Sequence, residues 1–321
     1  MKSYKQSCLK TAYAYNICLP AMLKIAWSPI YAHPLPEGHR FPMMKYELLP
    51  QQLLYEGTAT QENFFSPEPL TEKYILRAHE ATYWEKLKHQ NLSAKEIRRT
   101  GFPLSEQLVE REIIIAQGTI QCALFAQQYG VSLNVAGGTH HAFTDRGEGF
   151  CLLNDIAIAA YYLLDHQLAE RILVVDLDVH QGNGTAQIFR QEPRVFTFSM
   201  HGAKNYPMYK ETSDLDVGLE DQTTDTTYLA LLQQHLPKLI KAQKPDFIFY
   251  LSGVDILATD KLGRLAVSQR GCKERDQFVF DLCKTHQIPV AVSLGGGYSP
   301  RLYDIVEAHA NTFRVAQEIF F

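Results

Sequence analysis

The chain lacks a long hydrophobic run and has no excess of charge of one sign. No segment of its 321 residues approaches the ~18 consecutive apolar residues that a membrane-spanning helix needs. Its 31 Lys and Arg residues against 35 Asp and Glu residues give a net charge of -4, so no global basic field exists to hold nucleic acid by counterion release. We therefore expect neither a membrane span nor direct nucleic-acid binding.

The six cysteines form no CxxC pair and no regular pattern typical of a small domain crosslinked by disulfides. A chain of this length can bury enough apolar surface without disulfides. We therefore expect reduced thiols and a cytoplasmic location, or a nuclear one if the source is eukaryotic.

The first 23 residues have the outline of a signal peptide, with three lysines before a mildly apolar run at 11–23. Tyr13, Tyr15, Asn16 and Pro20 interrupt that run, and no small-residue cleavage site follows it. We expect residues 1–23 to be an N-terminal extension and residues 24–321 to form one catalytic domain, because no linker or low-complexity tract divides them.

Short, β-branched, largely apolar segments recur along the chain, and strands that are apolar on both faces belong to parallel sheets. Helical stretches lie between them, the clearest at 105–128, where Ser105 can cap the start and Gly130 can end the helix. The alternation predicts an α/β fold with a central, mostly parallel sheet between two helical layers. The predicted strands are 24–28, 131–136, 172–177, 195–199, 247–251 and 290–294, and the other helices are 155–165, 227–241, 273–285 and 300–317.

Polar motifs follow four of these strands, on the side where α/β sheets bind ligands. Asp176, Asp178 and His180 are spaced two apart and so share one face, which lets Asp178 and His180 contact one ion. Asp255, after another strand, can supply a third ligand. One histidine and two carboxylates, with a position left for water, are typical of a catalytic metal site that zinc or iron(II) would accept.

The motifs themselves resemble those of the histone deacetylase family. They are GGTHHA at 137–142, DRGEGFCLLND at 145–155, DLDVHQGNGT at 176–185, SGVDILATDKLGRL at 252–265 and LGGGY at 294–298. The resemblance runs from about residue 24 to the C-terminus and is strongest to class IV and its bacterial relatives. It implies the arginase-deacetylase fold.

The resemblance implies a zinc-dependent hydrolase that removes acetyl or longer acyl groups from lysine side chains. Zinc would be held by Asp178, His180 and Asp255. An amide is a poor electrophile, so the reaction needs a polarised carbonyl, activated water and a base that later returns a proton to the leaving amine. By resemblance, His141 is that base and acid, and His140 is the positioning, electrostatic member.

The remaining catalytic positions follow from the same resemblance. Asp176 is expected to pair with His140, and Asn183 with His141, where class I enzymes carry Asp. Tyr298 matches the tyrosine that stabilises the oxyanion. A phenol donor at that place contributes roughly 10² to 10³ in rate.

Further positions are also implied by resemblance. The substrate tunnel is expected to include Gly149, Phe150, Tyr206 and Gly296, and Arg40 resembles an arginine in the channel for departing acetate. A buried monovalent-cation site, with potassium expected, would involve Asp176, Asp178, His180, Ser199 and Met200.

The motifs bear on three alternative functions. A two-manganese ureohydrolase of the same fold needs an Asp-x-His-x-Asp pattern, and Gly182 stands where the last acid belongs. An acetylpolyamine amidohydrolase, acting on an acylated small amine, stays open, because the site chemistry recognises any acyl amide on a long amine. An inactive acyl-lysine binding protein is disfavoured because all catalytic positions are filled.

Overall fold

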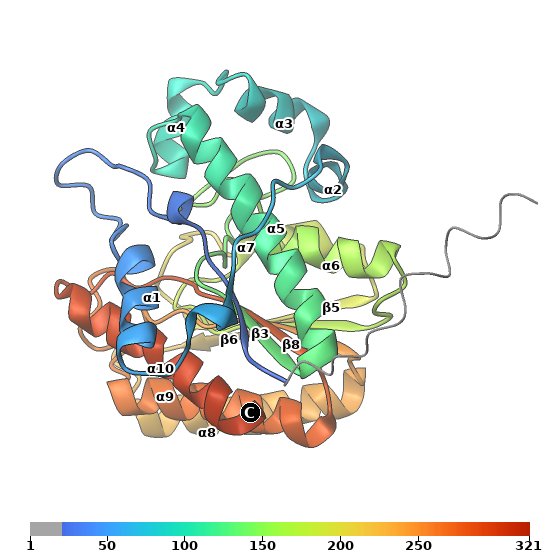
Figure 1. The fold of residues 1–321 in the computed structure, drawn as a ribbon, viewed down its shortest axis with the longest axis vertical. Helices are drawn as coiled ribbons and strands as arrows, with labels where there is room; N and C mark the ends of the chain where they lie inside the picture. The colour runs from blue at the N-terminus through green and yellow to red at the C-terminus, as the bar shows by residue number, and fades with distance from the viewer. Residues whose placement is uncertain (1–20) are drawn as a thin grey trace, which may run out of the picture.

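An eight-stranded sheet forms the centre of the structure (Figure 1), a computed structural model that describes residues 21–321. The strand order is β2-β1-β3-β8-β7-β4-β5-β6. Every neighbouring pair is parallel, so the predicted mostly parallel sheet is confirmed and is wholly parallel. The strands are β1 (Lys24–Ala26), β2 (Phe64–Phe65), β3 (Val131–Asn134), β4 (Ile172–Asp176), β5 (Val195–Gly202), β6 (Leu215–Leu219), β7 (Phe247–Leu251) and β8 (Val290–Ser293).

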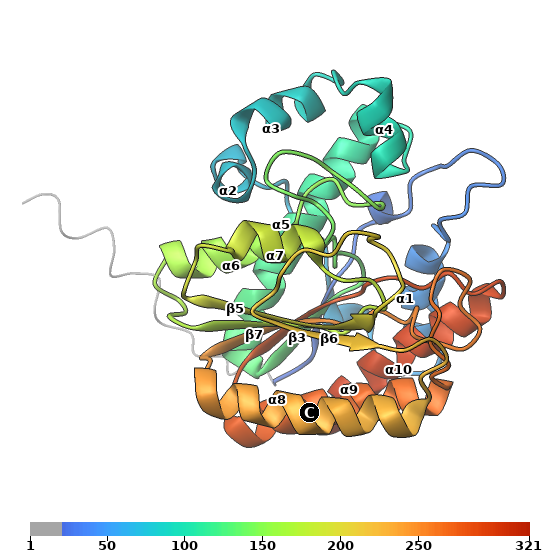
Figure 2. The same cartoon turned by 180° about the vertical axis from the view of Figure 1, so that it is seen from behind.

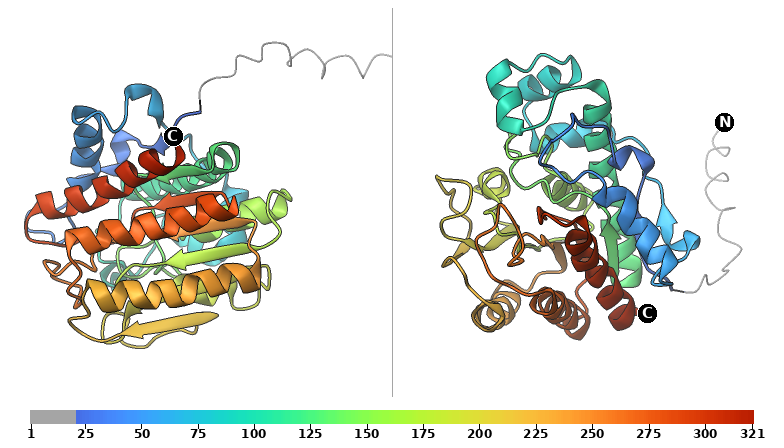
Figure 3. Two further views of the ribbon diagram at one scale, coloured as in Figure 1. Left: turned by 90° about the horizontal axis from the view of Figure 1, so that it is seen from below. Right: turned by 90° about the vertical axis from the view of Figure 1, so that its left-hand side faces the viewer.

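Helices cover both faces of this sheet, giving three layers (Figures 1 and 2). One face carries α5 (Glu106–Tyr129), α6 (Asp155–Asp165) and α7 (Asn183–Phe189). The other face carries α8, α9 and α10, which lie side by side when the molecule is seen from below (Figure 3). The three are α8 (Asp225–Gln243), α9 (Gln269–His286) and α10 (Leu302–Phe320).

Shorter helices complete the N-terminal third of the chain. The helix α1 packs against α10. The helices α2, α3 and α4 lie around the N-terminal end of α5 (Figure 1). No helix within residues 21–321 is both long and apolar enough to cross a membrane. The bounds are η1 (Pro29–Tyr31), α1 (Lys45–Tyr55), η2 (Gln61–Asn63), α2 (Glu72–Ala78), α3 (Ala81–Lys88) and α4 (Ala94–Thr100).

The two residues expected to delimit the long helix, Ser105 and Gly130, do so in the structure. The Ser105 side chain accepts a hydrogen bond from the Leu108 N–H, which caps the N-terminus of α5. Gly130 ends the helix with a positive φ of 90°, a conformation that glycine adopts without strain. The two strands at the edges of the sheet, β2 and β6, were not predicted. The proposed boundary at residue 24 stays a prediction, because residues 1–20 lie outside the described part of the chain.

A parallel sheet brings the carboxyl ends of its strands to one edge, and this sets the position of the site. The register aligns the last residue of β4, Asp176, with Ser199 on β5 and with Leu251 at the end of β7. It likewise aligns Asn134 on β3 with Ser293 on β8. The motifs that follow β3, β4, β7 and β8 therefore begin at the same edge.

Arg275 of α9 ties two of these strand ends together from behind. Its side chain is fully buried and forms an ion pair with the equally buried Asp276 at 2.8 Å. The guanidinium also donates to the carbonyls of Leu177 and Gly253, which directly follow β4 and lie shortly after β7. One buried cation thus links the backbone of both segments that lead into the site.

We expect Arg275→Met to lower the free energy of unfolding by about 3 to 5 kcal/mol, because it leaves the Asp276 carboxylate buried without its cation. Urea unfolding followed by circular dichroism measures this. Arg270→Met is the matched control, since Arg270 lies on the same helix with its side chain 84% exposed. It should change stability by less than about 0.5 kcal/mol. Equal losses in the two variants would contradict the role of Arg275.

Candidate active site

Three buried side chains at the carboxyl edge of the sheet form a possible metal centre. Asp178 and His180 follow β4, and Asp255 follows β7. The His180 Nδ1 atom lies 3.0 Å from Asp178 Oδ1 and 3.1 Å from Asp255 Oδ2. One ligand atom from each of the three lies within 4.8 Å of the others. The sequence-predicted ligands are therefore brought together by the fold.

The backbone holds both carboxylates in place. The Gly296 N–H donates to Asp178 Oδ2 at 2.7 Å, and the Val179 N–H donates to Asp255 Oδ1 at 2.9 Å. Gly296 lies so close that a Cβ atom there would stand 1.9 Å from Asp255 Oδ2. Only glycine allows this approach, which gives the glycine run before Tyr298 a physical reason.

The donor set fits a divalent cation. Burial and the neighbouring Asp178 carboxylate raise the pKa of Asp255 to about 7. Two carboxylates that share a buried site resist being ionised together, and a divalent cation between them compensates their charge. Two carboxylate oxygens and one imidazole nitrogen are donors that zinc accepts.

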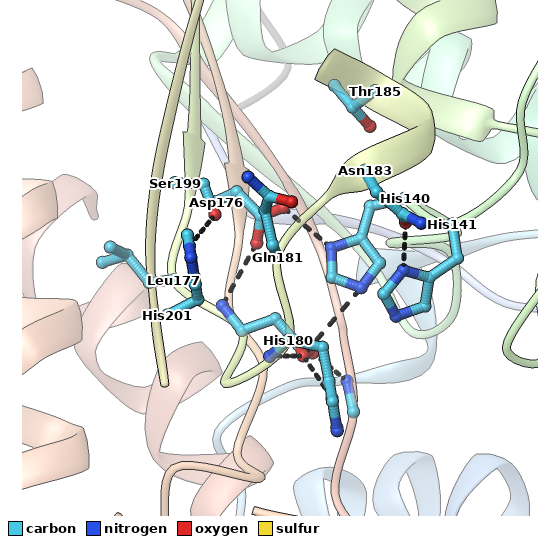
Figure 4. A network of polar contacts seen from close by, with 12 residues as sticks. His140, His141, Asp176, Leu177, His180, Gln181, Asn183, Thr185, Ser199 and His201 are labelled. Carbon is cyan, nitrogen blue, oxygen red and sulfur yellow. Dashed lines mark hydrogen bonds and ion pairs between the residues drawn. The ribbon is translucent and has the colours of Figure 1, made fainter. Parts of the chain in front are cut away.

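The tandem histidines lie beside this cluster and have different partners (Figure 4). The His140 Nδ1–H donates to Asp176 Oδ2 at 2.7 Å, and the His141 Nδ1–H donates to Asn183 Oδ1 at 2.6 Å. Their ring centroids are 4.1 Å apart. Each bond fixes the proton on Nδ1 and leaves Nε2 as the other functional atom of the ring.

These partners set the two imidazole pKa values in opposite directions. Burial alone would lower the pKa of His140, but the charge and hydrogen bond of Asp176 outweigh it and the pKa is raised. Burial lowers the pKa of His141 well below its ordinary value, and the nearby His140 and His180 lower it further. His141 is therefore the neutral ring of the pair, with a free lone pair on Nε2.

Tyr298 stands near the same cluster, with its ring centroid 6.4 Å from that of His180. Burial and the carboxylates of Asp255 and Asp178 raise its pKa well above 10. The phenol therefore keeps its proton and can act as a hydrogen-bond donor. Its backbone N–H donates to Asp260 Oδ2 at 2.6 Å, which anchors the loop after β8.

Asp155 at the start of α6 supports the loop that carries the histidines. Its carboxylate accepts hydrogen bonds from the Thr139 N–H and hydroxyl, and from the hydroxyls of Thr119 and Ser293. A buried carboxylate with all its acceptor positions filled gives this loop a fixed shape.

An outer pocket of about 220 Å³ leads from the surface to these groups. Tyr206 packs edge-on against His141, with ring centroids 4.9 Å apart, and its hydroxyl donates to Glu148 at 2.8 Å. Phe150 has a positive φ of 67°, which is unusual for a non-glycine residue and costs energy. The pocket is lined by Arg40, Arg99, His141, Gly149, Phe150, His180, Tyr206, Leu262 and Tyr298.

Three of the four predicted tunnel residues, Gly149, Phe150 and Tyr206, thus line the outer pocket. A Cβ at Gly149 would stand 2.7 Å from the His141 ring, so glycine lets this wall approach the histidine. The fourth, Gly296, lines an adjoining inner cavity of about 40 Å³, which shares Gly149 and Phe150 with the outer pocket. Arg40 is not among the residues that line this inner cavity, and it lies over the ring of Phe150 at 5.0 Å in the outer pocket.

Lys45 is a functional candidate that the sequence analysis missed. It is buried at the start of α1, and its ammonium donates to the carbonyl of Gly295 at 3.0 Å. Burial lowers its pKa to about 8, against the opposing effect of Asp255 and Asp178. With Arg111, which lines the inner cavity, it places positive charge behind the possible metal centre. A lysine among the apolar residues of the FPMMKY segment was the available signal.

The residues predicted for the monovalent cation lie at and just after the end of β4 and within the neighbouring strand β5. Ser199 pairs in register with Asp176, and Met200 follows it. The Ser199 hydroxyl lies 2.9 Å from the Nδ1 atom of His201. The binding of potassium at this place stays a prediction.

Residues 39–313 match the family described as the histone deacetylase domain. The chain therefore belongs to the histone deacetylase family, and the predicted family is confirmed. Membership supports a deacetylase activity, the hydrolysis of an amide. The assignment to a class IV-like branch stays a prediction.

Individual relatives agree with this membership. An uncharacterized protein of Picosynechococcus sp. (strain ATCC 27264 / PCC 7002 / PR-6) is 43% identical over 92% of this chain and 99% of its own length. Histone deacetylase 2 of Arabidopsis thaliana is 29% identical over 81% of this chain and 70% of its own. The fold is similar to a crystal structure of an HDAC homologue from Aquifex aeolicus, with a TM-score of 0.76, 21% identity, and coverage of 91% and 82% of the two chains.

Proposed function

We propose that this protein is a zinc-dependent hydrolase that removes acetyl groups from lysine side chains. The observation that carries the proposal is a pair of histidines with pKa values shifted in opposite directions beside a buried Asp-His-Asp cluster, with both histidines, Asp178 and His180 lining the inner cavity. Asp178, His180 and Asp255 would hold the zinc ion. Zinc there supplies Lewis acidity, which polarises an amide carbonyl and lowers the pKa of water to ~7.

His141 is the proposed general base and general acid. Its lowered pKa keeps the ring neutral near pH 7, and Asn183 holds the proton on Nδ1, so Nε2 can accept a proton from the attacking water. The same atom then returns the proton to the leaving lysine amine, which would otherwise be a poor leaving group.

His140 and Tyr298 are proposed to stabilise charge. Asp176 raises the pKa of His140, which favours the protonated imidazole, and a protonated ring there offsets the negative charge that develops on the attacked carbonyl. Tyr298 keeps its phenol proton, and its O–H can donate a hydrogen bond to the carbonyl oxygen. Donors held in place before the reaction are effective because they need no reorganisation.

The pocket walls favour an aliphatic stem that ends in an amide. Phe150, Tyr206 and Leu262 give the outer pocket apolar surface for the methylene groups of lysine. Beyond the reacting centre, the inner cavity offers only about 40 Å³ and is lined by Arg111, whose guanidinium pairs with the buried Glu112. Such an end suits a short acyl group and the acetate that it releases.

The activity itself is tested with a fluorogenic acetyl-lysine peptide. We expect the zinc-loaded protein to hydrolyse it and His141→Ala to lower kcat by about 10³-fold, while metal analysis finds the same zinc content in both proteins. A chelator should abolish the activity, and added zinc should restore it. Equal activity in the wild type and in His141→Ala would contradict the proposal, and binding without hydrolysis by the wild type would favour an inactive acyl-lysine binding protein.

Asn183→Asp tests the partner of His141. A carboxylate stabilises the protonated imidazole, so the variant should raise the pKa of His141 by about one unit. Because the base must be unprotonated, the acidic limb of the pH-rate profile should then move to higher pH. Asn311→Asp, which adds the same charge beside Arg314 on α10, is the control and should leave the limb unchanged. An unmoved limb in Asn183→Asp would refute the pairing.

The size of the inner cavity predicts the preference for acyl chains. We expect kcat/KM to fall by more than about tenfold from acetyl-lysine to octanoyl-lysine and myristoyl-lysine peptides, because burying extra methylene groups in a packed interior requires displaced side chains. Steady-state kinetics on one peptide sequence with the three acyl groups measures this. Faster hydrolysis of the long chains would show that the cavity opens and would overturn the preference.

A further inference from the structure

The mouth of the outer pocket is cationic. Two of its lining residues carry a full charge at neutral pH, Arg40 and Arg99, and no Asp or Glu occurs among the described residues that line it. The adjoining surface pocket, of about 860 Å³, again contains Arg40 and adds Lys261 against one acid, Glu47. A chain whose net charge is -4 therefore presents the opposite sign at this opening.

Both guanidinium groups are held at the opening by the wall of the pocket. The Arg40 guanidinium lies 5.0 Å from the centroid of the Phe150 ring, a cation–π contact. The carbonyl of Arg99 accepts a hydrogen bond from the Gly149 N–H at 3.1 Å, which fixes the end of α4 against the same wall. The Arg99 side chain remains 37% exposed, so its charge faces solvent and an arriving ligand.

One acid, Glu148, lies at ion-pair distance from Arg99 but has closer partners. The Glu148 carboxylate accepts hydrogen bonds from the Tyr206 hydroxyl and from Arg146 Nε, both at 2.8 Å. It stands at 4.0 Å from Arg99 Nε and is itself only 15% exposed. Within residues 21–321 no carboxylate comes within ion-pair distance of Arg40.

We infer that this mouth selects acyl-lysine residues flanked by acidic side chains and disfavours polycationic acyl amines. The inference rests on the proposed function and concerns the substrate class of the same site. Successive Cα atoms are 3.8 Å apart, so a carboxylate one or two positions from the modified lysine stands at the rim when the lysine stem fills the pocket. An acetylated polyamine would place its free ammonium groups at the same rim, beside two guanidiniums.

The test compares peptides that differ only in flanking charge. Acetyl-lysine peptides with Asp, with Gly–Ser or with Lys at the neighbouring positions are assayed with the zinc-loaded protein, together with acetylputrescine and acetylspermidine. We expect kcat/KM for the acidic peptide to exceed that for the basic one by about tenfold at low ionic strength. The ratio should shrink to about twofold at 0.5 M NaCl because salt screens exposed charges.

Charge reversal identifies the residues responsible. Arg40→Glu and Arg99→Glu should each reduce the ratio about threefold or more, and the double variant should invert it. Lys241→Glu is the matched control, because it makes the same charge change at an exposed position in the last turn of α8. This turn precedes the amino end of β7, whereas the site lies at the carboxyl ends of the strands. The variant should leave the ratio unchanged. Dissociation constants of the same peptides for His141→Ala, measured by fluorescence anisotropy, should rank in the same order without catalysis.

These outcomes distinguish a failure of the flanking-charge inference from a failure of the proposed function. Hydrolysis of the neutral peptide with no dependence on flanking charge, or with a preference for the basic peptide, overturns the inference and leaves the proposed function intact. A preference for acetylpolyamines over every peptide overturns both. Failure to hydrolyse any of the acetyl-lysine peptides refutes the proposed function itself.

Discussion

Two carboxylates buried side by side are the constraint on which this structure depends. Asp178 and Asp255 come from different strands, and their mutual repulsion in a water-poor interior must be offset for the fold to form. The backbone N–H groups of Val179 and Gly296 offset part of it. Behind them, Arg275 fixes the backbone that leads to both acids. The geometry that could hold a cation is thus the same geometry that fixes the sheet edge.

The tandem histidines show how such an interior gives different chemistry to two identical side chains. His140 and His141 are neighbours in sequence and equally buried, yet one faces a carboxylate and the other an amide. The Asp176 carboxylate raises the pKa of His140, whereas burial and the neighbouring histidines lower the pKa of His141. A neutral partner for His141 keeps its base form available, and a charged partner for His140 keeps a cation in place. The division of labour therefore depends on Asp176 and Asn183.

Much of this arrangement could be predicted from sequence because the signals are local. The central strands are continuous apolar runs, and α5 is delimited by Ser105 and Gly130. The edge strands gave no such signal: β2 has two residues, and β6 (LDVGL) alternates exposure and contains a glycine. The clustering of the candidate metal ligands was predictable because they follow strand ends in parallel order. A sheet with that order has one place where such side chains can meet.

Lys45 could not be found in this way, because its role depends on a contact 250 residues away in the chain. Neither could the sign of the charge at the mouth, since Arg40 and Arg99 come from segments with no common motif. These groups place charge of alternating sign around the site: positive at Arg40 and Arg99 in the outer pocket, negative at the pair of Asp178 and Asp255, and positive at Lys45, which contacts the carbonyl of Gly295. Each buried charge then faces the opposite sign, and the pKa of Lys45 is held up by the two acids even as burial lowers it. The net charge of the chain does not reveal this order, because it adds all charges without regard to where they lie, and the effect of a charge depends on its distance from the site.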